Sequence, residues 1–561
     1  MVLFTYIFLF FLGLFAIFFF ILWRILIIKP KILENRNTNI IQRSNPQQDF
    51  YSLDNNWLKK NSFGVWELFV SGSPFQIGLR NGILCKELIE IQEDYFVDEI
   101  KKIIPSSIFA FFLKLIVAWM NRKIDHFIPN EYLTEIYGVS ISAPQKYRYI
   151  ASNYQRYLNY HAANDIGHAV EDMHVVACTS FSVWNEKSAD GGLLVGRNFD
   201  FYFGESFAQE KIVSFYKPEN GHKFMMISWG GMIGAVSGMN DKGLTVTMNS
   251  VKSTMPTTAR TPLCIIGREI LQYASNIAEA FEIAKKHETF ISASFMIGSA
   301  KDKKSAVIEK STTNTFLFET DEMDFIACTN HYQSEGFSED PLNIQNIKES
   351  ASLYRLTRTK ELINQKLKIG VSEAAEILRD QKGINDIDLG VGNEKAINQM
   401  IAHHSIIFKP EELKVWISSK DYQLGEFICY DLNDVFSRSE NVNAETEFVI
   451  KENNIPADDF IRNGNLQKHR EFREIQDRIS KIAKKKLNKS LSAKEIQDFI
   501  SLNPLYYQTY SVIGDYYFTK KNFVDAKLSY EKALTTEIAK ENERNHILNR
   551  IEKSQEIIEK K

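Results

Sequence analysis

A cysteine in the first half of the chain is followed closely by charged side chains on an otherwise apolar segment. Cys178 stands in "ACTSFSVW", and after the turn "NEKSADGG" the segment "LLVGRNFDF" carries Arg197 and Asp200. A core strand seldom holds two charges, because burying an unpaired charge is costly. A guanidinium favours the thiolate form of a nearby cysteine, and the thiolate is the nucleophile. The pattern therefore predicts a catalytic site with a reactive cysteine.

The two segments read as a β-hairpin. Side chains alternate between the two faces of a strand. One face receives Cys178, Ser180, Ser182 and Trp184, and the other receives Thr179, Phe181 and Val183. Arg197 and Asp200 are three residues apart, so an ideal strand would point them to opposite faces. If both serve one site, we expect the second strand to end or bulge near Gly196.

Taken singly, these residues have ordinary explanations. A cysteine is often a small buried apolar residue, and Arg197 and Asp200 alone would suggest a structural ion pair. The chain has 561 residues, a formal net charge of −3 and five scattered cysteines without a CxxC pair. This length predicts about three structural units. The net charge gives no indication of nucleic-acid binding. The cysteine spacing favours one reactive thiol over a zinc site or a disulfide framework.

The first residues predict a membrane anchor. Met1–Trp23 holds no charged side chain, and a helix of about 20 apolar residues spans a bilayer core. We expect a single-pass, uncleaved anchor over residues 1–28. The basic residues after it favour a cytoplasmic body, although the side of the membrane stays open. A second apolar run, residues 103–120, predicts either a buried helix or another membrane contact that guides a lipid-like substrate.

Composition and the spacing of apolar residues divide the rest of the chain into segments. A polar tether is expected over residues 29–61 and a mostly helical segment over 62–177. Short alternating strands with Gly or Asn turns fill 178–444, which indicates an α+β domain. Residues 445–561 are charged and helical. Seven of them fall on the positions of one tetratricopeptide repeat: Tyr510, Ile513, Gly514, Tyr517, Ala526, Tyr530 and Ala533. This region is expected to be either a packing appendix or a surface that binds a protein partner.

Several segments together resemble one known family. "CTSFSVW" followed by "GRNFDF" is similar to the nucleophile region of the acyl-coenzyme A:6-aminopenicillanic acid acyltransferase family, which is related to choloylglycine hydrolases and acid ceramidases. "VSGSPFQIGLRNG" resembles the family's start, with Asn81 where a His is usual. "GMNDKGLTVTMNSV" places Asn249, "ACTNHY" places Asn330 and His331, and "SLYRLTR" places Arg355. The resemblance covers roughly residues 64–432.

The resemblance implies a cysteine N-terminal-nucleophile hydrolase with a four-layer αββα core. Members of this class are cut before the nucleophile, here between Ala177 and Cys178, so residues 62–177 would form a small chain or pro-segment. The new α-amine would accept the thiol proton. Arg197 would favour the thiolate and Asp200 would hold the α-ammonium. Asn249 or Asn330 would help to bind the oxyanion, Arg355 is the likelier functional Arg of its segment, and His331 has no assigned role.

These observations predict a self-processing cysteine acyltransferase or amidohydrolase that acts on an acyl amide or thioester, with a lipid-like substrate as one option. No cofactor, metal or nucleic acid is expected. Two alternatives stay open. One is a purely hydrolytic amidase of the ceramidase or bile-salt-hydrolase type. The other is a catalytically silent, membrane-anchored scaffold that binds partners through its C-terminal repeat.

Overall fold

The computed structural model describes residues 26–30, 42–104, 106–169, 176–201, 205–253, 258–320 and 323–560, together with Gly13 and Arg24. Its centre is a pair of β-sheets. In the described residues the larger sheet has 11 strands and the smaller has 6. The strands of the larger sheet, in spatial order, are β1 Ser44–Gln47, β2 Phe50–Leu53, β3 Asn56–Lys60, β4 Trp66–Gly72, β7 Ile212–Pro218, β8 Phe224–Ser228, β9 Ser237–Asn240, β10 Leu244–Val251, β11 Ser292–Ser299, β12 Lys304–Lys310 and β13 Thr315–Phe318. Those of the smaller sheet are β14 Phe325–Cys328, β5 Val176–Val183, β6 Leu194–Phe201, β15 Ala402–Lys409, β16 Lys414–Ser418 and β17 Phe427–Asp431.

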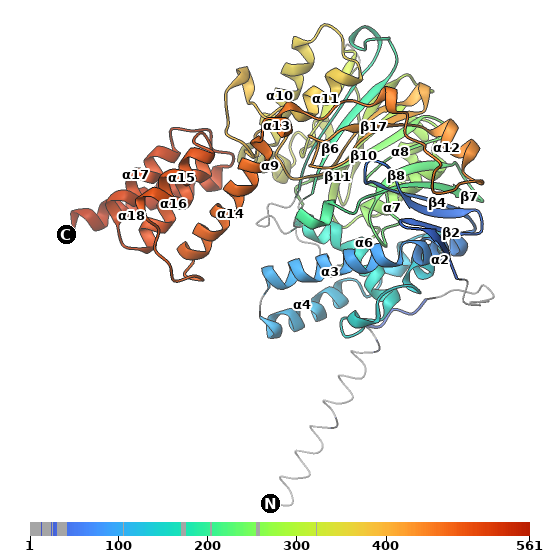
Figure 1. Ribbon diagram of the computed structural model, residues 1–561, viewed down its shortest axis with the longest axis horizontal. Helices are drawn as coiled ribbons and strands as arrows, with labels where there is room; N and C mark the ends of the chain where they lie inside the picture. The colour runs from blue at the N-terminus through green and yellow to red at the C-terminus, as the bar shows by residue number, and fades with distance from the viewer. Residues whose placement is uncertain are drawn as a thin grey trace, which may run out of the picture.

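The two sheets pack face to face, and helices cover their outer faces (Figure 1). One apolar cluster lies between the sheets and joins Phe215 and Met296 of the larger sheet to Ile406 and Ile417 of the smaller one. The smaller sheet is covered by α10 Ser352–Gln365 and α11 Val371–Arg379. The larger sheet is covered by α2 Pro74–Leu84, α3 Lys86–Ile103, α5 Asn130–Ser140, α6 Asn153–Ala169, α7 Leu263–Tyr273 and α8 Ile277–Lys286. The described part of the chain is thus an α+β protein whose core has the four expected layers.

The strand-to-helix turn at residues 71–74 forms as its residue types predict. Ser73 caps α2 with its side chain and Gln76 closes a capping box, while Pro74 occupies the first turn, where its missing N–H costs nothing. β4 before it pairs in parallel with β7. The N-terminal segment is therefore built into the larger sheet and its helical cover.

Residues 44–60 differ from the expected tether. They form β1–β3, which continue the larger sheet beyond β4. Trp57 and Leu58 are buried, and the Trp57 ring stacks on Phe448 with ring centroids 5.4 Å apart. The Asn and Gln content of this stretch suggested a linker, but its few large apolar side chains are enough to fix it on the sheet.

The C-terminal region is helical, as expected. Residues 449–455 first return along β17 through the bridges Tyr430–Val449 and Phe427–Ile455. The helices that follow are α13 Asp459–Arg462, α14 Asn465–Ala483, α15 Ala493–Leu502, α16 Tyr507–Thr519, α17 Phe523–Ala533 and α18 Glu541–Glu559. A Cβ on Gly514 would lie 2.6 Å from the Tyr530 ring, so α16 and α17 pack closely there. The tetratricopeptide repeat itself stays a prediction.

The apolar run at residues 103–120 is an exposed helix. α4 Ser107–Met120 has no buried residue, and Ile108, Phe109, Phe112 and Ile116 are each more than half exposed. The expected anchor, residues 1–28, lies mostly outside the described residues. Within the described ones, no individual helix combines the length and apolar character of a membrane span. The helix pair 86–103 and 107–126, bent by 118° at its break, meets those two criteria only when taken together.

Candidate functional site

The hairpin that carries Cys178 forms as the alternation of its side chains predicts. β5 and β6 are antiparallel, with Cys178 opposite Phe199 and Ala177 opposite Asp200. Ser180 faces the larger sheet and bonds Asn249 of β10, whereas Phe181 packs with the α11 side of the molecule. The expected interruption at Gly196 is absent, because the pairing of β5 with β6 runs from Val176 to Val183 without a shift. Gly196 instead leaves room for the Phe181 ring, which a Cβ there would approach within 2.8 Å.

Arg197 approaches the thiol on the face of β6 that is turned toward the larger sheet. Its Nη2 lies 3.6 Å from Cys178 Sγ. Its Nη1 donates to the Val236 carbonyl (2.9 Å), and the guanidinium also donates to the Ser237 hydroxyl and the Met248 carbonyl. A guanidinium has only donors, so these neutral acceptors hold it in place without cancelling its charge. The structure therefore places the Arg197 charge next to the cysteine sulfur.

Asp200 lies on the opposite face of β6. On that face Asn198 donates to the Leu378 and Ile397 carbonyls on the helical side, and Asp200 Oδ2 accepts from Gln399 (3.3 Å). Asp200 Oδ1 is buried and has no hydrogen-bond partner among the described residues. Burial raises the pKa of Asp200 to about 7, although the positive charges of Arg355 and Arg197 oppose the shift.

The backbone nitrogen of Cys178 explains how residues on opposite faces can serve one site. This N–H donates to Asn330 Oδ1 (2.9 Å), and Arg355 Nη2 donates to the same oxygen (2.5 Å). Because a backbone nitrogen lies in the plane of the sheet, groups from either face can reach it, whereas a side chain occupies one face. Arg197 thus serves the thiol, and the groups beside Asp200 serve the nitrogen that cleavage would turn into an α-amine.

Asn249 and Asn330 differ in how many amide protons they have in use. Asn249 Nδ2 donates to the Cys328 carbonyl (3.1 Å) and the Thr329 carbonyl (3.2 Å), which occupies both of its protons. Asn330 Nδ2 donates to the Ser250 carbonyl (2.9 Å), and its second proton has no acceptor among the described residues. Asn249 therefore ties β10 to the segment that carries Asn330, while Asn330 retains a donor.

The electrostatics of the intact chain keep the thiol protonated. Burial raises the pKa of the Cys178 thiol, and the nearby positive charge of Arg197 opposes the shift. The same burial lowers the pKa of Arg197 and of Arg355. All five cysteines of the chain are buried, so burial alone does not single out Cys178. Its contacts with Arg197 and Asn330 do.

Two further groups support the site without having been assigned from the sequence. Ser352 Oγ accepts from the Asn330 backbone N–H (2.8 Å) and bonds His331 Nδ1 (2.7 Å). Burial lowers the pKa of His331 to about 4, so this ring is neutral and orients Ser352. Ser352 lies in the quoted segment "SLYRLTR", in which only the arginines drew attention.

The second group lies behind Arg197. Ser237 Oγ accepts from Arg197, so its own proton is directed to His404 Nε2 (2.8 Å), and His404 Nδ1 bonds His403 Nδ1 (2.9 Å). A shift in the pairing of β15 with β6 between Ala402 and His404 accommodates His403. Two adjacent histidines in a strand were a visible signal for these residues, but no motif pointed to them.

The proposed cleavage site is partly described. Ala177 lies in β5 and pairs with Asp200, in extended backbone. Residues 170–175 lie outside the described residues. Among the described residues, no cluster of three or more His, Cys, Asp or Glu side chains is placed to hold a metal.

Comparison with protein families finds one match. Residues 184–423 match the family model "Acyl-coenzyme A:6-aminopenicillanic acid acyl-transferase". The matched range includes Arg197, Asp200, Asn249, Asn330 and Arg355, and it begins after Cys178. The match covers less than half of the chain.

Two curated relatives match part of the chain. An uncharacterized protein of Archaeoglobus fulgidus is 26% identical over 266 residues, which is 44% of each chain. Protein dcd1B of Dictyostelium discoideum is 24% identical over 271 residues, which is 45% of this chain and 51% of that protein. The chain thus matches about half the length of these relatives.

Solved structures are also similar, and two of them are hydrolases. The N-acylethanolamine-hydrolyzing acid amidase ortholog of Caenorhabditis elegans is 16% identical, with 42% of this chain and 93% of that chain covered and a TM-score of 0.30. A mutant of the conjugated bile acid hydrolase of Clostridium perfringens is 13% identical, with 48% and 95% covered and a TM-score of 0.32. With TM-scores of this size, the description of the fold rests on the sheets and helical layers of this chain alone.

Proposed function

We propose that the protein is a self-processing cysteine acyltransferase or amidohydrolase that acts on an acyl amide or thioester through an acyl-enzyme at Cys178. One observation carries the proposal. The sulfur and the backbone nitrogen of the same cysteine are held by separate charged groups, Arg197 at 3.6 Å from Sγ and the Asn330–Arg355 pair at the nitrogen. A structural cysteine needs neither group, whereas a nucleophile that uses its own amine as base needs both.

Self-processing would begin at the Ala177 carbonyl. Cys178 Sγ adds to this carbonyl carbon, the C–N bond breaks, and the thiol proton ends on the nitrogen, which leaves a thioester and a free amine. Water then cleaves the thioester, which returns the thiol and leaves a carboxylate on Ala177. Asn330 Oδ1, already an acceptor for this nitrogen, keeps the new amine in place.

Catalysis would then use the same atoms. A free α-amine has a reference pKa of about 7.7–8.0, so near neutral pH it can take the thiol proton. Asp200, whose Oδ1 has no hydrogen-bond partner among the described residues, would hold the resulting ammonium. The thiolate attacks the acyl carbonyl, and the leaving amine or thiol takes the proton. Water or an amine acceptor then releases the acyl group from Cys178.

The developing oxyanion needs a fixed donor. The count of amide protons favours Asn330 over Asn249 for this role, because both amide protons of Asn249 are already bound to carbonyls. Asn249 is then a positioning residue, which holds the segment that carries Asn330.

A mass shift on one residue tests the proposal. The full chain is treated with an acyl thioester or an activated acyl amide, quenched in acid, digested and mapped by mass spectrometry. We expect the acyl group on Cys178, in the wild type and in a Cys264→Ala control but not in Cys178→Ala. An added amine acceptor then separates transfer from hydrolysis. Acylation at another cysteine, or none in a folded wild-type chain with any acyl donor, would contradict the proposal.

We also propose that the enzyme works at a lipid surface, which α4 contacts. The α4 sequence SIFAFFLKLIVAWM has Lys114 as its charged residue, and this helix has no buried residue. Lys114 donates to the Tyr149 carbonyl (2.5 Å), and nearby Gln155 donates to the Leu26 carbonyl (2.6 Å). Leu26, which follows the uncharged segment in the chain, therefore contacts the body six residues along the sequence from the residue that Lys114 contacts. A membrane that holds this segment would lie within reach of the exposed apolar face.

Vesicle binding checks this surface. A chain that starts at Leu26 should co-sediment with vesicles of mixed zwitterionic and anionic lipid. Replacing Phe109, Phe112 and Ile116 with Gln should lower the bound fraction at least about fivefold, since each buried apolar side chain contributes about 1.5–3 kcal/mol. Gln at Val524 and Leu528, which are exposed on α17, is the matched control and should leave binding unchanged. Equal sedimentation of both variants would show that α4 is not the contact.

A further inference from the structure

A loop of the catalytic domain connects the candidate site to the C-terminal helices. Arg355 bonds Asn330 with one end of its guanidinium, and with the other, Nη1, it donates to the Glu394 carbonyl (3.0 Å). Glu394 belongs to the loop 389–395, "LGVGNEK", which has no helix or strand of its own. The position of Arg355 therefore depends on how this loop is held.

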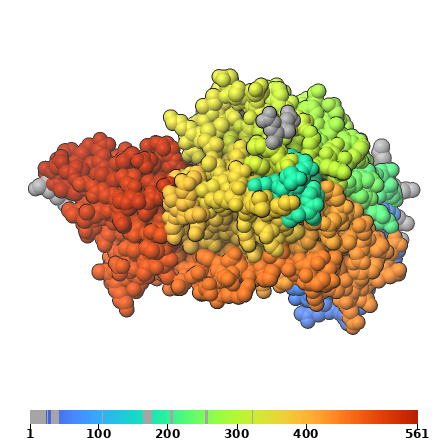
Figure 2. Space-filling view, turned by 90° about the horizontal axis from the view of Figure 1, so that it is seen from above, coloured from blue at the N-terminus to red at the C-terminus, as the bar shows by residue number. Residues whose placement is uncertain are grey.

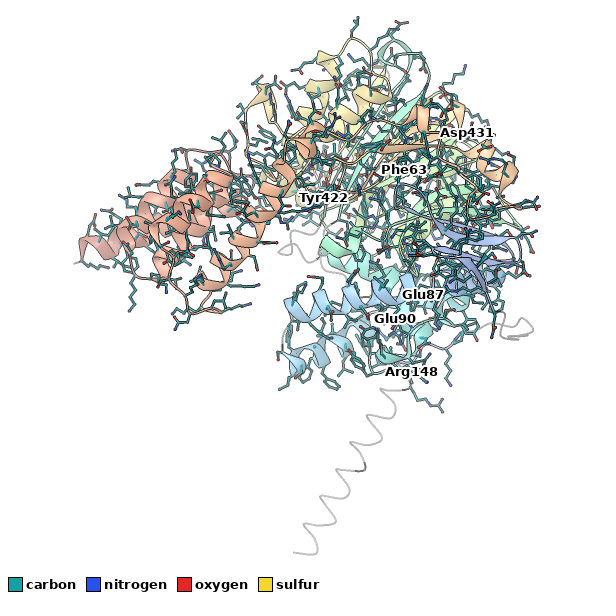
Figure 3. The ribbon with its side chains drawn as sticks, viewed as in Figure 1. Phe63, Glu87, Glu90, Arg148, Tyr422 and Asp431 are labelled. Carbon is teal, nitrogen blue, oxygen red and sulfur yellow. The ribbon has the colours of Figure 1, made fainter. Side chains whose placement is uncertain are left out.

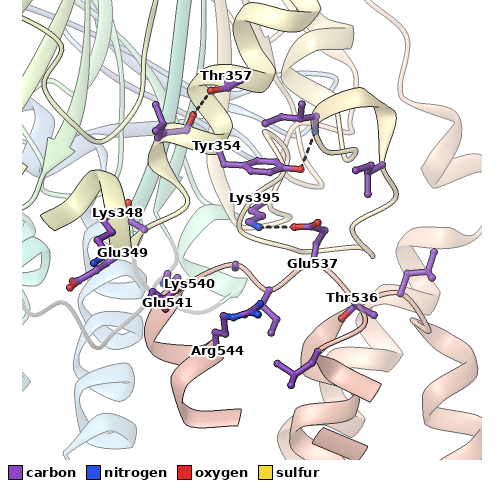
Figure 4. A pocket seen from close by; sticks show the side chains of 18 of the residues that line it. Lys348, Glu349, Tyr354, Thr357, Lys395, Thr536, Glu537, Lys540, Glu541 and Arg544 are labelled. Atoms are coloured by element: carbon purple, nitrogen blue, oxygen red, sulfur yellow. Dashed lines mark hydrogen bonds and ion pairs between the residues drawn. The ribbon is translucent and has the colours of Figure 1, made fainter. Parts of the chain in front are cut away.

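Polar contacts from the C-terminal helices hold the loop. Lys540 lies 3.2 Å from the Glu394 carboxylate, and Lys395 lies 2.7 Å from the Glu537 carboxylate (Figure 4). Asn393 Nδ2 donates to the Glu537 carbonyl (2.9 Å). Further along, the Asn503 side chain accepts from the Val391 N–H (3.1 Å) and donates to its carbonyl (2.9 Å). Much of the loop's hydrogen bonding is thus supplied by residues after position 500.

Close packing adds to these contacts. Gly390 has φ +73°, and a Cβ there would lie 2.5 Å from the Tyr506 backbone nitrogen. Val391 also packs against a small cluster made by Met400, Leu424 and Leu466, beside Tyr422 (Figure 3). Seen from above, the C-terminal helices adjoin the surface formed by the yellow part of the chain (Figure 2).

One side of this junction is open. A cavity of about 730 Å³ lies between α10 and the start of α18, lined by Tyr354, Lys395, Glu537 and Lys540 among others (Figure 4). Lys395 and Glu537 line this cavity with side chains that are 18% and 37% exposed, so their ion pair can be altered without disturbing buried side chains.

We propose that the C-terminal helical region is a positioning element of the active site. It fixes loop 389–395, the Glu394 carbonyl of this loop fixes Arg355, and Arg355 fixes the Asn330 oxygen that binds the Cys178 nitrogen. The inference rests on the proposed function, since it assigns regulation of the same site. The C-terminal region would then be more than a packing appendix. It contacts Glu394, and only Arg355 and Asn330 lie between Glu394 and Cys178 in this chain of contacts.

The proposal predicts an effect on chemistry that a purely structural region would not have. The Arg355 charge lowers the pKa of Asp200 against the effect of burial, together with Arg197. A displaced Arg355 would therefore let the pKa of Asp200 rise. The acidic limb of the kcat/KM profile should then move to higher pH, and kcat should fall more than KM changes.

Charge reversal in the full chain tests this. Glu537→Lys places a like charge beside Lys395, and we expect kcat to fall at least about fivefold with the acidic limb moved upward. Lys395→Glu should have a similar effect. The double variant Lys395→Glu/Glu537→Lys restores opposite charges and should recover kcat to within about threefold of the wild type. Reversal of the Lys527–Glu531 pair on α17, which is 3.3 Å apart and far from the loop, is the control.

The outcomes separate this inference from the proposed function. A wild type that forms no acyl-enzyme at Cys178 would overturn the proposed function and with it the inference. An active wild type whose single reversals have unchanged kcat and pH profiles would overturn the inference alone. If the single variants lose activity and the double variant recovers none of it while its melting temperature equals the wild type's, the loop is not held through this pair, which also overturns it.

Discussion

Arg197→Ala should lower kcat/KM for acyl release by at least about 10²-fold, because it removes the positive charge nearest to the thiolate. Arg197 Nη2 lies 3.6 Å from Sγ, and burial raises the thiol pKa, so the thiolate needs this charge. The variant should also unfold at a lower temperature. Arg197 ties β6 to the Val236 and Met248 carbonyls, and a buried acceptor left without a donor costs about 1–3 kcal/mol.

Arg197→Lys separates these two effects. A lysine keeps the charge but cannot reach the thiol and both carbonyls at once. We expect it to retain more acylation than Arg197→Ala while losing a similar amount of stability, as measured by single-turnover acylation and by thermal unfolding. Arg358→Lys, in a buried arginine that pairs with Asp380 (3.0 Å) rather than with the site, is the control for loss of a buried guanidinium. Near-normal turnover of Arg197→Ala would refute the assigned role.

Asp200→Asn should also lower kcat/KM by at least about 10²-fold, because the α-ammonium would lose its counter-charge. The substitution keeps the shape and the contact with Gln399, so the fold should remain. Asn198→Asp on the same strand is not a suitable control, since Asn198 donates to two carbonyls. Gln399→Ala is more informative, because it removes the Asp200 partner while leaving the carboxylate, and it should cost less than Asp200→Asn.

The stability of Asp200→Asn should depend on pH in a defined direction. The pKa of Asp200 is raised from 3.8 to about 7 in the folded chain. The folded state therefore disfavours the ionised form, so the wild type loses stability relative to the variant as pH rises from about 4 to about 7, and the difference is constant above that range. Melting temperatures at pH 5 and pH 8.5, measured in the unprocessed Cys178→Ala background, check this. The melting temperature of Asp200→Asn minus that of the wild type should be larger at pH 8.5 than at pH 5. An equal or smaller value at pH 8.5 would contradict the assignment.

Local features of the site could be predicted from the sequence. The faces of the β5 strand follow from alternation, which depends only on neighbouring residues. The structure brings Arg197, Asn330 and Arg355 into contact with Cys178 or its partner, as the ordered motifs suggested. Asp200 lies on the opposite face of β6 from Arg197, so it would act at the Cys178 backbone nitrogen and not at the thiol. The sequence suggested a bulge, but the backbone nitrogen can be reached from both faces without one.

Features that depend on distant contacts could not be predicted. Residues 44–60 looked like a tether, since the partner of Trp57 is Phe448, almost four hundred positions away in the chain. The dependence of Arg355 on the C-terminal helices rests on Glu394, Lys395 and Glu537, and neither the composition nor the periodicity of those segments marks them. Ser237 and His404 reach Arg197 because β9 and β15 lie on the two sheets that enclose it.

Intact-mass measurement of the purified full chain under denaturing conditions tests the central claim most directly. The account predicts two chains, one that ends at Ala177 and one that starts at Cys178 with a free α-amine, and a single uncut chain for Cys178→Ala. An active preparation that contains only the full-length chain would contradict self-processing, and so would a Cys178→Ala chain that is still cut between these two residues.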